Sequence, residues 1–133
     1  MIKVVKFGGS SLASARQFEK VGEIIRSDAE RRYVVPSAPG KRHMHDTKVT
    51  DMLYTCYELA EQGKSFGAQL KQIRLRFEEI ITGLDMSLSL ENEFQEIEEQ
   101  FQQKAGREYA ASRGEYLNGI IMAQYLHYTF IDA

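Results

Sequence analysis

The chain has 133 residues, of which 17 are basic and 19 acidic, so its formal net charge is −2. Hydrophobic residues make up 43% and charged residues 27%, which excludes a disordered, collagen-like or membrane-spanning chain. The near-balanced charge gives no indication of a nucleic-acid or membrane partner. The single cysteine excludes an internal disulfide framework, and the N-terminus does not resemble a signal peptide, so a cytoplasmic location is expected.

The first third of the chain is predicted to be a strand, a helix and a second strand. Residues 2–7 are mostly apolar and β-branched, and they stop at a Gly8-Gly9 pair, which indicates a strand that ends in a turn. Residues 12–31 carry apolar side chains on one helical face, and residues 33–37 form a second apolar run. This order favours a βαβ unit with parallel strands and a right-handed crossover.

The middle of the chain has the apolar spacing of helices. A polar loop at 39–49 is followed by a helix over 50–63, where Gly63 is the expected stop. Apolar side chains then recur at intervals of three and four across residues 64–111, with a break at 83–87. We therefore expect two antiparallel helices that form a hairpin.

The end of the chain is expected to be a last helix over about 115–127 and a third strand over 129–133. A sheet of two or three strands is small, because sheets usually have about 4–6 strands. Open α/β sheets bind ligands beyond the carboxyl ends of their strands, and no segment follows the third expected strand. The 133 residues are therefore expected to be part of a larger α/β domain.

The first group of candidate functional residues is Lys6-Phe7-Gly8-Gly9-Ser10-Ser11, where the first strand meets a helix. Two glycines let backbone N–H groups approach an anion, and a helix N-terminus adds positive potential. Lys6 supplies a charge for a phosphoryl group in transfer. The alternative is a tight turn with a serine N-cap and a surface lysine. Neither the P-loop motif nor G-x-G-x-x-G is present.

A second group follows the second strand and consists of Ser37 and Lys41, with Thr50 further on. A strand that ends in small residues leaves space for a ligand, which the two hydroxyls and the lysine could bind. The alternative is that Thr50 caps a helix and Ser37 only bonds to the turn.

The third group is Ser112-Arg113-Gly114-Glu115, which has the Ser-x-x-Glu spacing of a capping box before an apolar helix. Capping alone explains this spacing. The functional alternative places Glu115 at the start of that helix, where its carboxylate recognises a cationic group such as a substrate amine.

Three further residues are weak candidates. His43 and His45 share one face of an extended segment, but no cysteine or acidic cluster has matching spacing, so no metal site is predicted. Cys56 lies on the apolar face of its helix, which predicts a core role rather than a nucleophile.

Taken in order, four stretches of the sequence resemble the aspartate kinases of the amino acid kinase family. They are KFGGSS at 6–11, VVPSAPGK at 34–41, KVTDML at 48–53 and SRGEYLNG at 112–119, and the chain ends in FIDA. KFGGS is shared across the wider family, whereas SRGEYL together with SAPGK and the following TD is more specific to aspartate kinases. The hairpin at 64–111 matches the family in position more than in motif.

The resemblance implies a three-layer αβα domain with a mainly parallel sheet, here an incomplete N-terminal half with the 64–111 hairpin as an insertion. It also implies transfer of the γ-phosphoryl group of ATP, with Mg²⁺ bridging the phosphates, to the side-chain carboxylate of L-aspartate. The product, 4-phospho-L-aspartate, enters lysine, threonine and methionine synthesis. The later kinase-domain segments and the regulatory ACT domains of the family are not in these 133 residues, so this chain alone is expected to be inactive.

By motif position, the resemblance implies roles for seven residues. Lys6 resembles the lysine that stabilises charge on the transferred phosphoryl group. The positions that resemble the phosphate-holding loop are Gly8, Gly9 and Ser10. The positions that resemble aspartate-binding residues are Ser37, Thr50 and Glu115, with Glu115 facing the substrate amine. The family usually has threonine where Ser10 stands, and serine keeps the hydroxyl.

Two other interpretations stay open. One is a different family member that phosphorylates glutamate, acetylglutamate, carbamate or a nucleotide. The other is a non-enzymatic interaction module in which the hairpin mediates assembly, although the retained Lys6, Thr50 and Glu115 argue against it. An exposed sheet edge or helix face also leads us to expect a homo-oligomer.

Overall fold

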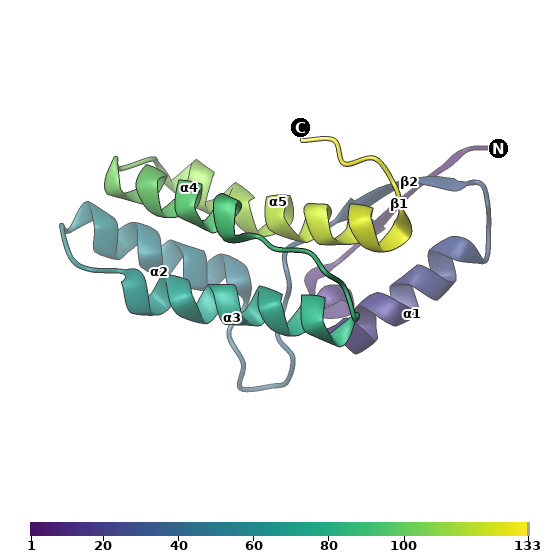
Figure 1. Ribbon diagram of the computed structural model, residues 1–133, viewed down its shortest axis with the longest axis horizontal. Coiled ribbons are helices and arrows are strands. Elements are labelled where there is room, and N and C mark those ends of the chain that lie inside the picture. Colours follow the sequence, from purple (N-terminus) through teal and green to yellow (C-terminus); the bar gives the residue numbers. More distant parts are fainter. Residues whose placement is uncertain (133) are drawn as a thin grey trace.

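The computed structural model describes residues 1–132, and its first third is a βαβ unit (Figure 1). Strand β1 (Lys3–Phe7) and strand β2 (Arg31–Pro36) pair in parallel. Helix α1 (Ala15–Arg26) connects them and lies along one side of the sheet. The predicted parallel unit is therefore confirmed.

A short 3₁₀ turn, η1 (Gly9–Leu12), separates β1 from α1, so the helix begins later than expected. The backbone of Ser14 is extended, and its hydroxyl oxygen accepts a hydrogen bond from the Gln17 amide at 3.4 Å. Ser14 is thus the N-cap of α1. The apolar face of the helix is buried through Phe18, Val21 and Ile25.

Helices cover only one face of the two-stranded sheet. The partly buried residues of the covered face are Val5, Phe7 and Val34. On the other face, Val4 is 68% exposed, Tyr33 52% and Val35 47%. The described residues thus form an incomplete α/β domain, with a sheet that is open to solvent on one side.

The remaining helices form a bundle: α2 (Val49–Glu61), α3 (Gly67–Gly83), α4 (Glu91–Gln102) and α5 (Arg107–Leu126). Successive helices run in opposite directions, and α2 packs against both α3 and α5 (Figure 1). Two helices were expected between residues 64 and 111, and α3 and α4 fill most of that range. Their rings Phe77 and Phe94 lie 6.1 Å apart between centroids. None of the described helices is long and apolar enough to cross a membrane.

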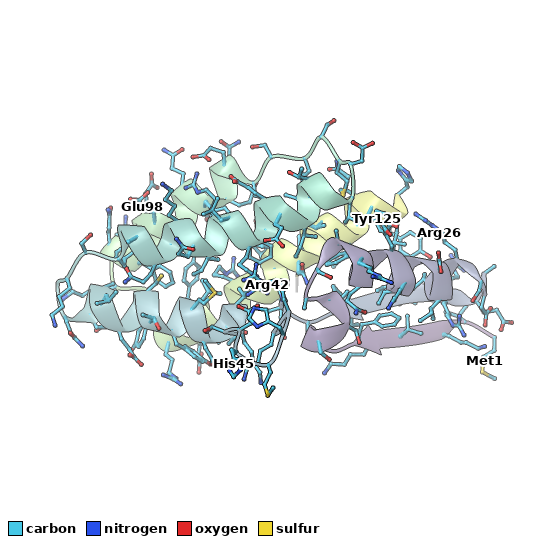
Figure 2. The ribbon with its side chains drawn as sticks, turned by 90° about the horizontal axis from the view of Figure 1, so that it is seen from below. Met1, Arg26, Arg42, His45, Glu98 and Tyr125 are labelled. Carbon is cyan, nitrogen blue, oxygen red and sulfur yellow. The ribbon has the colours of Figure 1, made fainter. Side chains whose placement is uncertain are left out.

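Helix α5 joins the bundle to the βαβ unit. The ring of Tyr125 lies over Gly22 of α1, where any Cβ atom would come within 2.8 Å of the ring. The Arg26 guanidinium stacks on the same ring at 5.0 Å, and its Nη2 donates to the Tyr125 carbonyl at 3.0 Å. Figure 2 shows these two side chains together. They hold α1, and with it the sheet, against the bundle.

Two expected helix boundaries are wrong. Helix α4 ends at Gln102 instead of continuing to the end of the 64–111 range, because Lys104 adopts a left-handed backbone with φ of 58°. Helix α5 begins at Arg107, well before the expected start at residue 115. The Ser112–Glu115 segment therefore lies inside a helix, and the predicted capping box does not form.

The expected third strand is also absent from the described residues 129–132, and Ala133 lies outside the described part. The ring of Phe130 packs on Tyr116 at 5.8 Å and covers Gly119. These contacts direct the segment onto α5 instead of into a ladder with β2. The Tyr128 hydroxyl donates to the Arg31 carbonyl at 3.2 Å, which fixes the start of the segment.

Candidate functional site

The carboxyl ends of the two parallel strands lie at one edge of the sheet, and their following segments touch. The Ser37 amide donates to the Phe7 carbonyl at 3.1 Å. Three residues further along the chain, the Gly40 amide donates to the Gly9 carbonyl at 2.8 Å. The glycine turn and the segment after β2 are therefore in direct contact, at the edge where α/β sheets bind ligands.

Lys6 is exposed on the open face of the sheet, beside Val35 in register. Among the residues that the structure describes, Lys6 takes part in no salt bridge. Its ammonium group is therefore available to an anion held at the end of β1.

The glycine turn consists of Gly8, which directly follows β1, and of Gly9 and Ser10, which are the first half of η1. Gly8 has an extended backbone and precedes η1, which has no side-chain cap. The serine that caps α1 is Ser14, so capping does not explain Ser10 or Ser11.

Thr50 is the second residue of α2 and does not cap it. The N-cap is Lys48, which makes no side-chain cap bond. The Val49 amide donates to the Pro39 carbonyl at 3.1 Å, which brings the start of α2 beside the segment that carries Ser37. The capping explanation of Thr50 is wrong, and this half-buried residue lies at the same end of the sheet as the glycine turn.

Helix α5 closes the other side of the site. At Gly114 a Cβ atom would come within 2.6 Å of the Ala38 side chain, so glycine lets the helix approach closely. Asn118 is fully buried, and its Nδ2 donates to the Ser37 carbonyl at 2.8 Å. Glu115 is exposed and lines a cavity of about 380 Å³ between β2, α5 and residues 128–132.

Arg113 lines the same cavity and is held by two tyrosines. Its guanidinium lies 4.7 Å from the ring centroid of Tyr109 and 4.4 Å from that of Tyr116. Its Nε donates to the Ser112 hydroxyl at 3.0 Å. Burial raises the pKa of both tyrosines, so they stay neutral and present their ring faces to the cation.

The loop between β2 and α2 is fixed by charged groups. Arg42 Nε lies 2.7 Å from Asp46 Oδ2, and Arg42 Nη1 lies 3.0 Å from Glu79 Oε2 on α3. The hydrogen bond from Arg42 holds the pKa of Asp46 well below its usual range. Arg76 of α3 also donates to this loop, through the carbonyls of Gly40 and Thr47.

The sequence analysis missed Arg76 and Asn118, and it assigned no role to Arg113, although this residue stands within the third candidate group. Arg76 stands three residues after Ile73 and four before Ile80, so a charged residue occupies an apolar position of the helical pattern. That irregularity is the signal that could have identified it. Asn118 lies within the SRGEYLNG stretch, and its burial is a tertiary effect.

The weaker candidates have no partners in the site. Burial raises the pKa of the Cys56 thiol to about 11, so it is a neutral core residue as predicted. His43 and His45 are exposed in the loop before α2. Within residues 1–132, no three histidine, cysteine or acidic side chains are close enough together to hold a metal ion.

The chain is an α/β domain in which the ends of two parallel strands and the glycine turn meet at one edge of the sheet. A sequence profile described as the amino acid kinase family matches residues 1–133. The chain belongs to this family, which confirms the family that the motifs indicated.

Three known proteins are similar to this chain. Aspartokinase 3 of Bacillus subtilis (strain 168) is 61% identical over 57 residues, which cover 43% of this chain and 13% of that protein. The crystal structure of Clostridium acetobutylicum aspartate kinase matches 98% of this chain at 48% identity, with a TM-score of 0.93. E. coli aspartokinase III in complex with aspartate and ADP matches 96% at 26% identity, with a TM-score of 0.73. The chain spans 30% and 29% of the two crystallised chains.

Proposed function

We propose that the polypeptide that carries this chain is an aspartate kinase. It transfers the γ-phosphoryl group of ATP to the side-chain carboxylate of L-aspartate, which gives 4-phospho-L-aspartate and ADP. The observation that carries the proposal is the contact between the glycine turn and the segment after β2. Glu115 of α5 lines a separate cavity beside β2, which none of the other six proposed site residues lines. The similarity to aspartate kinases, one of them in complex with aspartate and ADP, supports the proposal.

In this proposal Lys6 and the glycine turn form the phosphate end of the site. The backbone N–H groups of the turn would hold the phosphates of ATP, and a Mg²⁺ ion bound with the nucleotide would supply further neutralisation of their charge. Lys6 neutralises charge on the phosphoryl group during transfer. The acceptor carboxylate is already ionised and needs no strong base, so catalysis depends on alignment and charge neutralisation.

The aspartate end of the proposed site consists of Ser37, Thr50 and Glu115. The two hydroxyls bind the carboxylates of the substrate, and Glu115 pairs with its amine. The product supplies lysine, threonine and methionine synthesis, which is a cytoplasmic pathway. Assay of the polypeptide with aspartate, glutamate, acetylglutamate and carbamate tests the choice of acceptor, and a preference for any acceptor other than aspartate contradicts the proposal.

Replacing Glu115 by glutamine is expected to raise KM for aspartate roughly thirtyfold, since a charge pair with the amine contributes about 2 kcal/mol. The kcat value should change much less, because the pair is present in the ground state as well. Steady-state kinetics at varied aspartate concentration measure both constants. Glu98→Gln is the matched control, because Glu98 lies on α4 far from the strands (Figure 2). An unchanged KM in Glu115→Gln contradicts the assignment.

The 133-residue chain alone is expected to show no turnover with ATP, Mg²⁺ and aspartate. Phosphoryl transfer needs several charges around one group, and few contacts here are available to hold ATP. The open sheet face, with Val4, Tyr33 and Val35 exposed, should also cause self-association. A coupled assay and light scattering test the two expectations. Turnover above that of a Lys6→Ala control contradicts the first, and a monomer at high concentration contradicts the second.

A further inference from the structure

Two polar side chains are buried among the described residues, and both bind the same segment. Arg76 of α3 is 4% exposed and Asn118 of α5 is 0% exposed. The carbonyls that accept their hydrogen bonds belong to Ser37, Gly40 and Thr47. These residues all lie in the connection between β2 and α2, here called the β2–α2 segment (residues 37–48).

Arg76 binds two distant points of the β2–α2 segment with one guanidinium group. Its Nη2 donates to the Gly40 carbonyl at 2.7 Å, and its Nη1 donates to the Thr47 carbonyl at 2.9 Å. Asp46 Oδ2 lies 3.6 Å from the same Nη1. A planar guanidinium presents its donors in a fixed fork, so the two carbonyls are held at a set separation.

The two carbonyls, of Gly40 and Thr47, each lie next to one end of the proposed site. The Gly40 amide donates to the Gly9 carbonyl at 2.8 Å, so Gly40 links Arg76 to the glycine turn. Thr47 directly precedes Lys48, the N-cap of α2, and Thr50 follows in the first turn. The guanidinium therefore connects the phosphate end of the site with the aspartate end.

Stability alone is a poor explanation for this arrangement. Arg76 Nε and Asn118 Oδ1 are buried without a hydrogen-bond partner among the described residues, and such atoms cost stability. The nearby Asp46 is bound mainly by Arg42 at 2.7 Å, and Arg42 is visible beside the loop in Figure 2. Apolar residues of similar volume often stabilise a core more than a buried charge does. A geometric role explains why a cation stands there.

We propose that Arg76 is a positioning residue, which sets the distance between the glycine turn and the start of α2 and so aligns the phosphoryl donor with the aspartate carboxylate. The proposal rests on the proposed function. A displacement of about 1 Å between reacting groups is enough to cost roughly a hundredfold in rate.

The test compares Arg76→Lys and Arg76→Met in the polypeptide that carries this chain. Both variants are expected to lower kcat at least tenfold, while KM for aspartate and KM for ATP change less than about threefold. Arg74→Met is the control: Arg74 lies on the same helix, but its guanidinium binds Glu91 and stacks on Phe94 at 5.2 Å. Lysine keeps the charge and loses the fork, so wild-type kcat in Arg76→Lys overturns the proposal.

Amide hydrogen exchange gives a readout that does not depend on activity. In Arg76→Lys, the amides of Gly40 and Val49 should lose protection, while the amides of α1 and α4 keep theirs. If the amides of all helices and strands lose protection equally, Arg76 only stabilises the fold. If exchange at the Gly40 amide is unchanged, Arg76 does not fix the β2–α2 segment. Either result overturns the proposal. If the wild-type polypeptide does not phosphorylate aspartate, the proposed function fails, and the exchange pattern still decides whether Arg76 fixes the segment. If Arg76→Met does not fold, Arg76→Lys decides both measurements.

Discussion

Replacing Lys6 by alanine is expected to lower kcat for aspartate phosphorylation by a factor of roughly 10²–10³, the usual effect of removing one group that stabilises transition-state charge. Lys6 is exposed on the open face of β1 and makes no salt bridge within the described residues. Its loss should therefore leave the melting temperature nearly unchanged. The lost interaction strengthens as charge moves during transfer, so kcat should fall more than KM for ATP rises.

Lys3→Ala is the matched control for this prediction. Lys3 begins the same strand, and its Nζ lies 2.7 Å from Asp28 at the opposite end of the sheet. Surface ion pairs of this kind contribute little to stability, because solvent screens them, so Lys3→Ala should leave turnover unchanged. Steady-state kinetics with saturating ATP and aspartate give kcat for both variants. If the Lys6→Ala variant keeps the wild-type kcat, Lys6 is not part of the catalytic site.

The βαβ unit and most of the bundle could be predicted because their signals are local. The β-branched run before Gly8 and Gly9 indicates a strand and a turn, and the three-four spacing from Phe66 onward indicates helices. The predicted start of α5 is too late because the helix is buried on several sides, which weakens the apolar periodicity. The Ser-x-x-Glu spacing at 112–115 also resembles a helix start, whereas these residues lie within α5, where Gly114 lets the helix approach Ala38.

The proximity of candidate site residues could be predicted from chain order where those residues follow a strand. The glycine turn and Ser37 come directly after β1 and β2, so topology brings them together. Arg76 and Asn118 act on carbonyls that are 36 and 81 positions away in the sequence. A local pattern carries no information about such contacts, because they depend on how α3 and α5 pack against the β2–α2 segment.

Gly40→Ala is expected to lower both stability and turnover, because Gly40 touches the glycine turn through backbone atoms alone. A Cβ atom at this position would lie 2.6 Å from the Gly9 carbonyl carbon, 2.8 Å from the Ser10 nitrogen and 2.9 Å from the Gly9 oxygen. No flexible side chain is present to move aside, so the turn itself must shift. Overpacking of this kind costs about 1–3 kcal/mol.

The same shift should separate the phosphate end of the site from the aspartate end, and kcat should fall roughly a hundredfold even in molecules that remain folded. Thermal unfolding and steady-state kinetics, the latter at a temperature well below the transition, measure the two effects separately. Gly67→Ala is the matched control, because a Cβ there meets no atom within 4 Å beyond its chain neighbours and the backbone of its own helix, and alanine favours the first turn of α3. Normal turnover in Gly40→Ala shows that the contact between the turn and the β2–α2 segment is not needed for catalysis. The alternative result is a fall in kcat that is larger than the loss of folded protein can explain. Such a fall shows that Gly40 sets the distance between the glycine turn and the β2–α2 segment, in addition to its effect on the stability of the fold.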